Sequence, residues 1–570
     1  MTGPAVRHCR LAGALLATSA LVLPSATAAQ SLAPSREELT KITQQPEQPK
    51  PTLNIVGGVE RSPCPLADPR YADIRVNIRE VEFNNLKGAT QEEMRAAWSP
   101  FAGTDQPVSV LCEIRDAAAT ILRDKGYLAA VQVPTQRIEN GVVKMETLYA
   151  RITTVRARGE TGGAEAKLAA YLNKLTEDEY FDRNKAERYL LLARDLPGYN
   201  VQLTLKPAGT GPGELIGEVA VLHQTFTVDV MVQNLASRAT GRWGGQVRAQ
   251  AFGLTGLGDS TSISFYSTAD FKEQKILQAA HSFRPGSEGL TIDGQFTYAW
   301  TKPDIGGNSA TPDLKAKTLF WTIDARYPIV RSQSSNLWAG VGFDFVDQKV
   351  HFFEPLTRDK LRVLWLRADW DAIDLSSRRP GWRMSAFAEI RRGLGIFDAT
   401  DGDEDVPPSR ADGDSTATVF RMGGTGEVAL GRDFALSISP RLQYALDPLL
   451  SFEEFTAGNY TIGRGYDPAT LSGDSGVGLS AELRGPRILP VKRSKLAVQP
   501  FIFGDAAWVW NKHDGEGADH LTSAGGGVRA ELADRFRLDG TVAVPLEKTG
   551  FDNRKGDVRV LVTLTAKILP

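Results

Sequence analysis

Few residues in this sequence are spaced for bond-making chemistry. The six histidines of the 570-residue chain are scattered, and none forms a pair with the spacing of metal ligands. No Gly-x-Ser-x-Gly elbow or phosphate-binding loop stands out, and nothing indicates that serine, histidine and aspartate side chains converge. The sequence therefore predicts no enzyme and no metal or cofactor site.

Two carboxylates instead lie on the polar faces of alternating segments. Around Asp505, one face carries Phe501, Phe503, Asp505 and Ala507, and the other carries Ile502, Ala506, Trp508 and Trp510. Around Glu482, one face carries Gly478, Ser480, Glu482 and Arg484, and the other carries Val477, Leu479, Ala481 and Leu483. Because the opposite faces suit lipid, we expect Asp505 and Glu482 to face an interior that contains water.

The N-terminus has the pattern of an export signal. Basic residues from Arg7 to Arg10 precede an apolar core over Leu11–Leu23 and a small-residue site, Ala26-Thr27-Ala28. The core is too short to span a bilayer comfortably, which disfavours a membrane anchor. Residues 1–28 are therefore expected to be a cleaved signal peptide.

Cleavage would remove Cys9 and leave two of the three cysteines, Cys64 and Cys112. In an oxidising compartment two cysteines can form one structural disulfide, and we favour that outcome over two separate thiols. The formal net charge of −2 gives no electrostatic argument for a nucleic-acid partner. After the signal, no segment offers the roughly 20 apolar residues of a membrane helix, so the chain is either soluble or a transmembrane barrel.

Residues 29–70 read as a proline-rich linker that cannot bury a core of its own. Within it, Ser35-Arg36-Glu37-Glu38 can cap a short helix, with Leu39 and Ile42 on one face. Such a helix could plug a barrel, and the alternative is a frayed turn.

Two small α+β units follow, over residues 71–150 and 151–225. The first is predicted from an alternating strand over Arg75–Phe83, a capping box at Thr90–Glu93 and an Asn140-Gly141 hairpin signal. Both units have the order strand, helix, helix, strand, strand, which indicates an internal repeat of about 75 residues.

From Phe226 to the C-terminus the pattern keeps a period of two. About 16 segments alternate, many of them near ten residues long, and aromatic residues such as Trp300 and Trp508 lie near segment ends. The connections alternate between tight ones, such as Gly256–Asp259, and long ones, such as Asp447–Gly476. A soluble β-sandwich would have shorter strands, so residues 226–570 are predicted to form a 16-stranded transmembrane β-barrel.

Several motifs in the barrel region resemble one known family. The opening Val232–Trp243, which contains Asn-Leu-Ala-Ser-Arg-Ala-Thr-Gly, and the turn Gly256–Asp259 resemble the first hairpin of the TpsB proteins. These are haemolysin secretion and activation transporters of the ShlB/FhaC/HecB type, within the superfamily of POTRA–β-barrel outer-membrane translocators. Ile462-Gly463-Arg464-Gly465-Tyr466 resembles their Arg-Gly-Tyr loop motif, with one residue inserted. Phe503, Asp505 and Ala507 resemble a strand motif in which Ala507 replaces the usual glycine.

The resemblance implies that the two small units are POTRA domains and that the Arg-Gly-Tyr loop folds back into the lumen. Arg464, with Gly465 and Tyr466 beside it, would then find acceptors at Asp505 and Glu482. A guanidinium suits this task because its fixed fork can bond a carboxylate with two donors. The terminus Lys567–Pro570 departs from the aromatic end of many such barrels.

The expected function is protein export by two-partner secretion. The protein would lie in the bacterial outer membrane, with POTRA domains in the periplasm that bind an unfolded haemolysin- or adhesin-type exoprotein by strand addition. Other expected partners are outer-membrane lipid and, for insertion, the barrel-assembly machinery. The alternatives are an assembly factor for other barrels, a passive porin and a barrel enzyme. A porin would leave the POTRA units unexplained, and a barrel enzyme would need a catalytic set that the sequence lacks.

Overall fold

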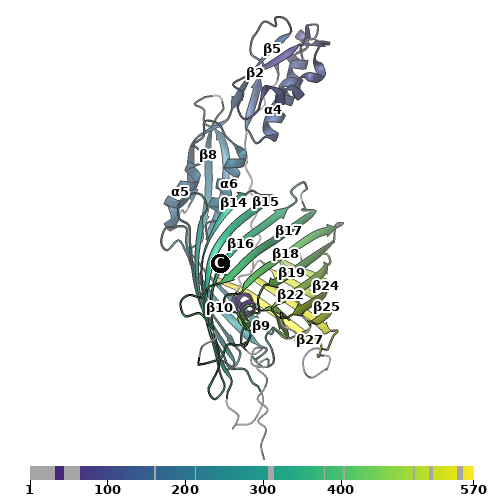
Figure 1. Ribbon diagram of the computed structural model, residues 1–570. Helices are drawn as coiled ribbons and strands as arrows, with labels where there is room; N and C mark the ends of the chain where they lie inside the picture. The colour runs from purple at the N-terminus through teal and green to yellow at the C-terminus, as the bar shows by residue number, and fades with distance from the viewer. Residues whose placement is uncertain are drawn as a thin grey trace, which may run out of the picture.

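The computed structural model describes residues 33–43, 64–159, 162–211, 213–305, 313–377, 379–401, 405–491, 495–512, 518–533, 535–548 and 556–569. The expected signal peptide, residues 1–28, and most of the expected linker lie outside this part of the chain. The described residues form a short helix, two small α+β modules and one closed antiparallel β-barrel, with both modules at one end of the barrel (Figure 1).

The first module has a three-stranded sheet in the order β2-β5-β4, in which β2 is parallel to β5 and β4 is antiparallel to it. The apolar side of its long helix, which includes Ile114, Ala118 and Leu122, is fully buried in the module core. The predicted capping box at Thr90 and Glu93 is present. The elements are β1 (Arg75–Asn77), β2 (Glu80–Asn84), α3 (Gln91–Met94), β3 (Asp105–Pro107), α4 (Val110–Asp124), β4 (Ala129–Gln132) and β5 (Val142–Tyr149).

The prediction of one continuous strand over Arg75–Phe83 was wrong. The chain changes partner within this segment, because β1 pairs with β3 whereas β2 pairs with β5. The physical reason is a slip in alternation: Val76 and Ile78 are buried at even positions, but Val81 and Phe83 are buried at odd positions. A straight strand cannot turn both pairs toward one core.

The second module repeats the arrangement of the first. Its sheet has the order β6-β8-β7, in which β6 is parallel to β8 and β7 is antiparallel to β8. The elements are β6 (Arg151–Gly159), η5 (Gly162–Ala164), α5 (Glu165–Asn173), α6 (Arg183–Arg194), β7 (Tyr199–Pro207) and β8 (Glu214–His223). The matching topology supports the repeat read from the sequence.

The second module packs directly on the end of the barrel through α6. The Asp195 carboxylate accepts two hydrogen bonds from Arg331 at 2.7 and 2.9 Å. The Tyr189 hydroxyl donates to Glu288 at 2.9 Å, and Arg188 donates to the Pro328 carbonyl at 3.0 Å. These contacts fix the module against the turn that follows β12 (Gln274–Phe283) and against the end of β14 (Lys315–Arg331).

Among the described residues, the barrel wall has sixteen positions. Strands β9 to β19 form eleven, β22 and the short β23 both pair with β24 and share the twelfth, and β24 to β27 add four. Antiparallel pairing of β27 with β9 closes the barrel. The bounds are β9 (Phe226–Gln233), β10 (Gly244–Phe252), β11 (Ser260–Thr268), β12 (Gln274–Phe283), β13 (Thr291–Thr301), β14 (Lys315–Arg331), β15 (Ser335–His351), β16 (Pro355–Ile373), β17 (Trp382–Gly393), β18 (Thr418–Leu430), β19 (Phe434–Ala445), β22 (Ser475–Arg484), β23 (Ile488–Val491), β24 (Leu496–Trp510), β25 (Ala518–Leu532), β26 (Phe536–Pro545) and β27 (Arg559–Leu569).

Alternation along each strand separates the two faces of the wall as the sequence predicted. On β24, Ile502 and Trp508 are 60% and 43% exposed on the outside, whereas Phe503 and Asp505 are 6% and 4% exposed on the inside. On β22, Leu479 is exposed outside and Glu482 is buried inside. An apolar outer face and a polar inner face are typical of a transmembrane barrel. No helix in the described ranges has the length and apolar character needed to cross a bilayer.

Candidate functional site

The long connection between β19 and β22 folds into the barrel. It contains η6 (Ser451–Glu453) and a two-stranded hairpin of β20 (Phe455–Ala457) and β21 (Leu471–Gly473). Residues of this inward loop pack with inward-facing wall residues in one buried apolar cluster, made of Phe455, Ala457, Ile462, Tyr466, Leu471, Ala507, Val509 and Leu521. Apolar burial therefore holds the loop inside the lumen.

Arg464 lies at the tip of this loop and reaches the wall at Asp505. Its Nε and Nη2 donate to the two carboxylate oxygens of Asp505 at 3.0 and 2.8 Å, and its backbone N–H donates to the same group at 3.0 Å. Nη1 donates to Glu482 at 3.1 Å. The guanidinium carbon also lies 3.5 Å from the ring centre of Phe503. The loop tip is thus held by paired charge, hydrogen bonds and a cation–π contact.

The carboxylates that receive Arg464 have further partners in the wall. The Ser480 hydroxyl donates to Asp505 at 2.7 Å. Glu482 accepts two hydrogen bonds from Arg529 at 2.5 and 3.0 Å and one from Arg484 at 2.7 Å. These contacts within the wall fix both carboxylates without the loop, so the wall presents a preorganised acceptor for one guanidinium.

The two residues after Arg464 fit tightly against the last strands of the barrel. A Cβ on Gly465 would lie 2.8 Å from the Ser523 Cβ and from the Pro545 nitrogen, so only glycine fits without a shift. The Tyr466 hydroxyl lies 2.9 Å from the Thr522 carbonyl oxygen and accepts from the Glu547 N–H at 2.9 Å. The Arg-Gly-Tyr tip therefore contacts both β24 and the β25–β26 region.

The inward strand motif consists of Phe503, Asp505 and Ala507 on one face of β24. Phe503 supports the guanidinium, Asp505 accepts its hydrogen bonds, and Ala507 is fully buried in the cluster that contains Ile462. The methyl group of Ala507, in place of the glycine of the family motif, packs against the loop.

A short helix near the N-terminus, α2 (Arg36–Thr43), also lies in the lumen, where Figure 1 shows it as a purple coil inside the barrel. Ser35 caps it by accepting the Glu38 N–H at 3.2 Å. Leu39 and Ile42 are each 1% exposed and pack with lumen residues such as Phe452. Of the two alternatives that the sequence left open, the short helix is present and the frayed turn is not, and the apolar face of the helix is buried by the barrel interior.

Helix α2 contacts both the wall and the inward loop. The Thr456 hydroxyl of β20 donates to Glu37 at 2.6 Å, and Glu37 also pairs with Arg441 of β19. Arg36 lies 3.8 Å from Glu389 and 3.9 Å from Asp344. The helix and the loop both occupy the lumen and contact each other.

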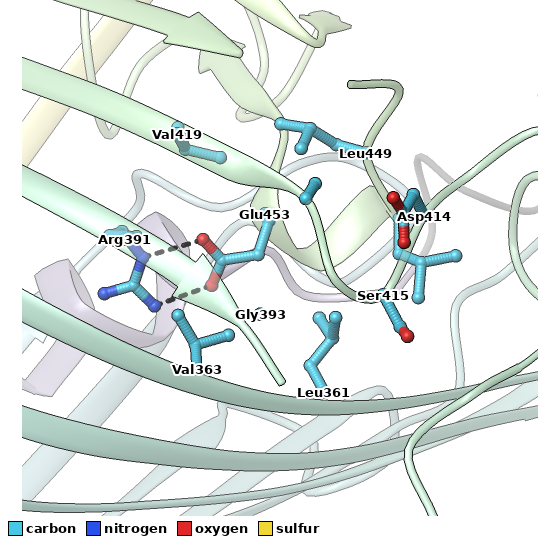
Figure 2. A pocket seen from close by; sticks show the side chains of 11 residues that line it. Leu361, Val363, Arg391, Gly393, Asp414, Ser415, Val419, Leu449 and Glu453 are labelled. Carbon is cyan, nitrogen blue, oxygen red and sulfur yellow. Dashed lines mark hydrogen bonds and ion pairs between the residues drawn. The ribbon is translucent and has the colours of Figure 1, made fainter. Parts of the chain in front are cut away.

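Two buried charge networks were not predicted from the sequence. Arg391 on β17 is 1% exposed and donates to Glu453 of the loop at 2.9 and 2.8 Å, as Figure 2 shows. Arg410, in the β17–β18 connection, donates to Glu454 at 3.0 Å and to Asp474 at 2.6 Å. The alternation of polar and apolar residues could have predicted that Arg391 faces the lumen. No local sequence pattern identifies its partner Glu453, or the partners of Arg410, because these residues lie in loops.

Far from the lumen, Cys64 and Cys112 form a disulfide with a Cα–Cα distance of 6.0 Å. It joins the chain that enters the first module to α4. The described residues contain no group of three or more histidine, cysteine, aspartate or glutamate side chains that could hold a metal ion.

Comparisons with known proteins agree with this architecture. Residues 220–530 match the family model of the haemolysin secretion/activation proteins ShlB/FhaC/HecB, and residues 76–148 match the ShlB-type POTRA domain. No curated protein matches the sequence. Among solved structures, CdiB from Escherichia coli is similar with a TM-score of 0.72 and 16% identity, over 90% of this chain and 94% of that chain. CdiB from Acinetobacter baumannii is similar with a TM-score of 0.65 and 16% identity, over 93% and 97% of the two chains.

The first family match spans more than half of the chain and includes the inward loop, Arg464 and Asp505. The fold shared with CdiB covers both modules and the barrel. The family match and the POTRA match indicate an outer-membrane protein with its POTRA modules in the periplasm. The chain therefore belongs to the ShlB/FhaC/HecB family of haemolysin secretion/activation proteins, the β-barrel transporters of two-partner secretion.

Proposed function

We propose that this transporter captures an unfolded exoprotein in the periplasm with its POTRA modules and passes it through the barrel once α2 and the inward loop allow a path. The observation that carries the proposal is the filled lumen. A wide barrel is occupied by α2 and by a loop that Arg464 holds against Asp505 and Glu482. A passive porin needs neither a helix and loop that must move out of its lumen nor periplasmic modules.

The edges of the module sheets support capture by strand addition. In the described chain β6 and β7 are the edge strands of the second module, and each has nine residues. An edge strand presents unpaired N–H and C=O groups, to which an extended polypeptide can add as a further strand. Main-chain bonding accepts many sequences but requires an extended client, as export demands. The docking of α6 on the barrel keeps these edges beside its periplasmic mouth.

The partners follow from this route. The client would be a secreted haemolysin- or adhesin-type exoprotein. The apolar outer face would contact outer-membrane lipid, and the barrel-assembly machinery would insert the chain. The alternative of an assembly factor for other barrels shares the same loop, but the two modules and the secretion-type family match favour secretion.

The experiment is co-production with a candidate exoprotein of the haemolysin or adhesin type, sought among the neighbouring genes. A strain with the transporter should release that exoprotein into the medium, and a strain without it should retain or degrade it in the periplasm. The abundance of other outer-membrane barrel proteins, measured in the same two strains, distinguishes a secretion transporter from an assembly factor. Loss of those barrels with unchanged exoprotein release would identify an assembly factor instead.

A further inference from the structure

A row of basic side chains crosses the outer face of the barrel near the end far from the POTRA modules. Lys275 of β12 lies opposite Trp300 of β13, which lies opposite Lys317 of β14. Lys317 lies opposite Lys349 of β15, and Lys349 lies opposite Arg358 of β16. We call these five residues the outer basic row. Figure 1 shows β14, β15 and β16 side by side in the wall.

The row points outward, as the strand alternation shows. The neighbours Ala299 and Ala316 face the lumen and are buried, whereas Trp300 is 39% exposed. The side chains of Lys349 and Arg358 are 40% and 33% exposed. The outer row therefore contacts whatever surrounds the barrel at this level.

The outward residues between the row and the membrane centre show at which level of the bilayer the row lies. On β12–β14 the next outward residues toward the membrane centre are Leu277, Tyr298 and Leu319, and beyond them lie Phe296 and Trp321. On β15 and β16 the next outward residues are Asp347 and Lys360. Tyr298 and Trp300 pack together with ring centres 4.4 Å apart. An aromatic belt marks the interface, so the basic row lies where lipid headgroups begin.

Within the described ranges, the charge of the row is balanced only in part. The carboxylate that pairs with it there is Asp347, at 3.8 Å from Lys349 and 3.3 Å from Arg358. Three cations on consecutive strands stand about 5 Å apart, and like charges opposite one another destabilise a sheet. An external anion at this place would remove that repulsion.

The same level on β9, β10 and β11 is uncharged. Continuing the row from Lys275 in the other direction leads to Ser267 of β11, Gly245 of β10 and Val232 of β9. The basic character is thus confined to β12–β16 and is not a general property of the barrel rim among these strands. A localised row indicates a site of defined chemistry.

We propose that the outer basic row binds the phosphate groups of an anionic lipid in the outer leaflet, with Lys317, Lys349 and Arg358 as the main ligands. Lys317 stands above an apolar and aromatic surface on β13 and β14, so one molecule can place acyl chains on Tyr298, Leu319 and Trp321 and its phosphates on the cations. Arginine and lysine both bind phosphate well. The site would fix the tilt and depth of this side of the barrel.

The test uses the full-length protein, purified in detergent with a chelator to remove divalent cations, and diphosphoryl lipid A as the probe. The variant K317Q/K349Q/R358Q removes three cations from the row. The control variant R379Q/R432Q/R487Q removes three exposed arginines from the opposite end of the wall. Heat-modifiable mobility on gels verifies that each barrel is folded, and native mass spectrometry measures lipid binding.

We expect the row variant to bind lipid A at least about tenfold more weakly, because each cation near an anionic surface contributes about fivefold in affinity. The control variant should bind as the unchanged protein does, and lipid A stripped of its phosphates should bind weakly to all three. Equal binding of diphosphoryl lipid A by the row variant and the control would overturn the proposal. Equal binding of the two lipids by the unchanged protein would also overturn it.

Discussion

Arg464 at the tip of the inward loop donates two side-chain hydrogen bonds to the carboxylate of Asp505 on β24, at 3.0 and 2.8 Å. The two residues are 41 positions apart in sequence, and the bond joins a loop to the wall behind it. Because the loop lies in the lumen, this pair, together with the apolar cluster around Tyr466, holds the loop tip against the wall.

Removal of either partner should therefore impair secretion more than stability. Loss of a charge-assisted bond worth roughly 1.5–3 kcal/mol lowers the equilibrium constant for the bound loop tip, relative to the released tip, by about ten- to hundredfold. Arg464→Ala and Asp505→Ala should each sharply reduce exoprotein release at near-normal barrel abundance, since water in the lumen screens the unpaired charge. Arg464→Lys should also be impaired because it loses the fork. Secretion assays with immunoblots of the membrane fraction measure both quantities.

A second comparison tests whether the pair acts as a unit. The double variant should be no worse than either single variant, which is the non-additivity of contacting residues. The matched control is Arg326→Ala, which breaks a pair with Asp293 at 2.6 Å between two wall strands and frees no loop. Equal reductions of secretion by Arg326→Ala and Arg464→Ala would contradict a specific role of the loop tip in secretion.

Deletion of Arg75–Leu222 should stop secretion without preventing barrel formation. The barrel closes by strand pairing alone, whereas the modules contribute the free sheet edges and the α6 contacts at its mouth. The deleted protein should still give a protease-resistant, heat-modifiable band in the outer membrane. Undiminished release of the exoprotein would remove the argument for strand addition.

Loss of the Cys64–Cys112 bond should destabilise the first module. The bond closes a loop with a sequence separation of 48, and such a constraint contributes roughly 2–4 kcal/mol. Peptide mapping without reductant should show the linked peptides. In Cys112→Ser, limited proteolysis should cut the first module sooner and leave the barrel intact. An unchanged cleavage rate would show that the module does not depend on the bond.

The contacts of α2 should limit the flow of ions through the barrel. Glu37 bonds Thr456 and pairs with Arg441, so Glu37→Ala weakens the attachment of the helix to both loop and wall. Channels of this variant in planar bilayers should open more often than those of the unchanged protein. Thr40→Ala is the control, because Thr40 is exposed and its hydroxyl donates within the helix, to the Arg36 carbonyl. Identical conductance in both variants would contradict a plugging role for α2.

Much of the fold could be predicted because its pattern is local. A period of two fixes which side of β24 carries Asp505 and which side carries Ile502, and no tertiary information is needed. The alternation in Arg75–Phe83 misled the prediction because two strands with opposite phase follow one another. Arg391 bonds Glu453 and Arg410 bonds Glu454 in a folded loop, and the sequence carries no short-range signal for such a pairing.

The central claim is that an extended exoprotein passes through the lumen of this barrel. The direct measurement places a photo-crosslinking residue at Gln295 or at Phe296, which are adjacent on β13 but face the lumen and the lipid, respectively. The exoprotein is fused to a stably folded domain so that it stalls during export. The account predicts a crosslink to the client from position 295 and none from position 296. Equal crosslinking from both positions, or crosslinking from 296 alone, would contradict passage through the lumen.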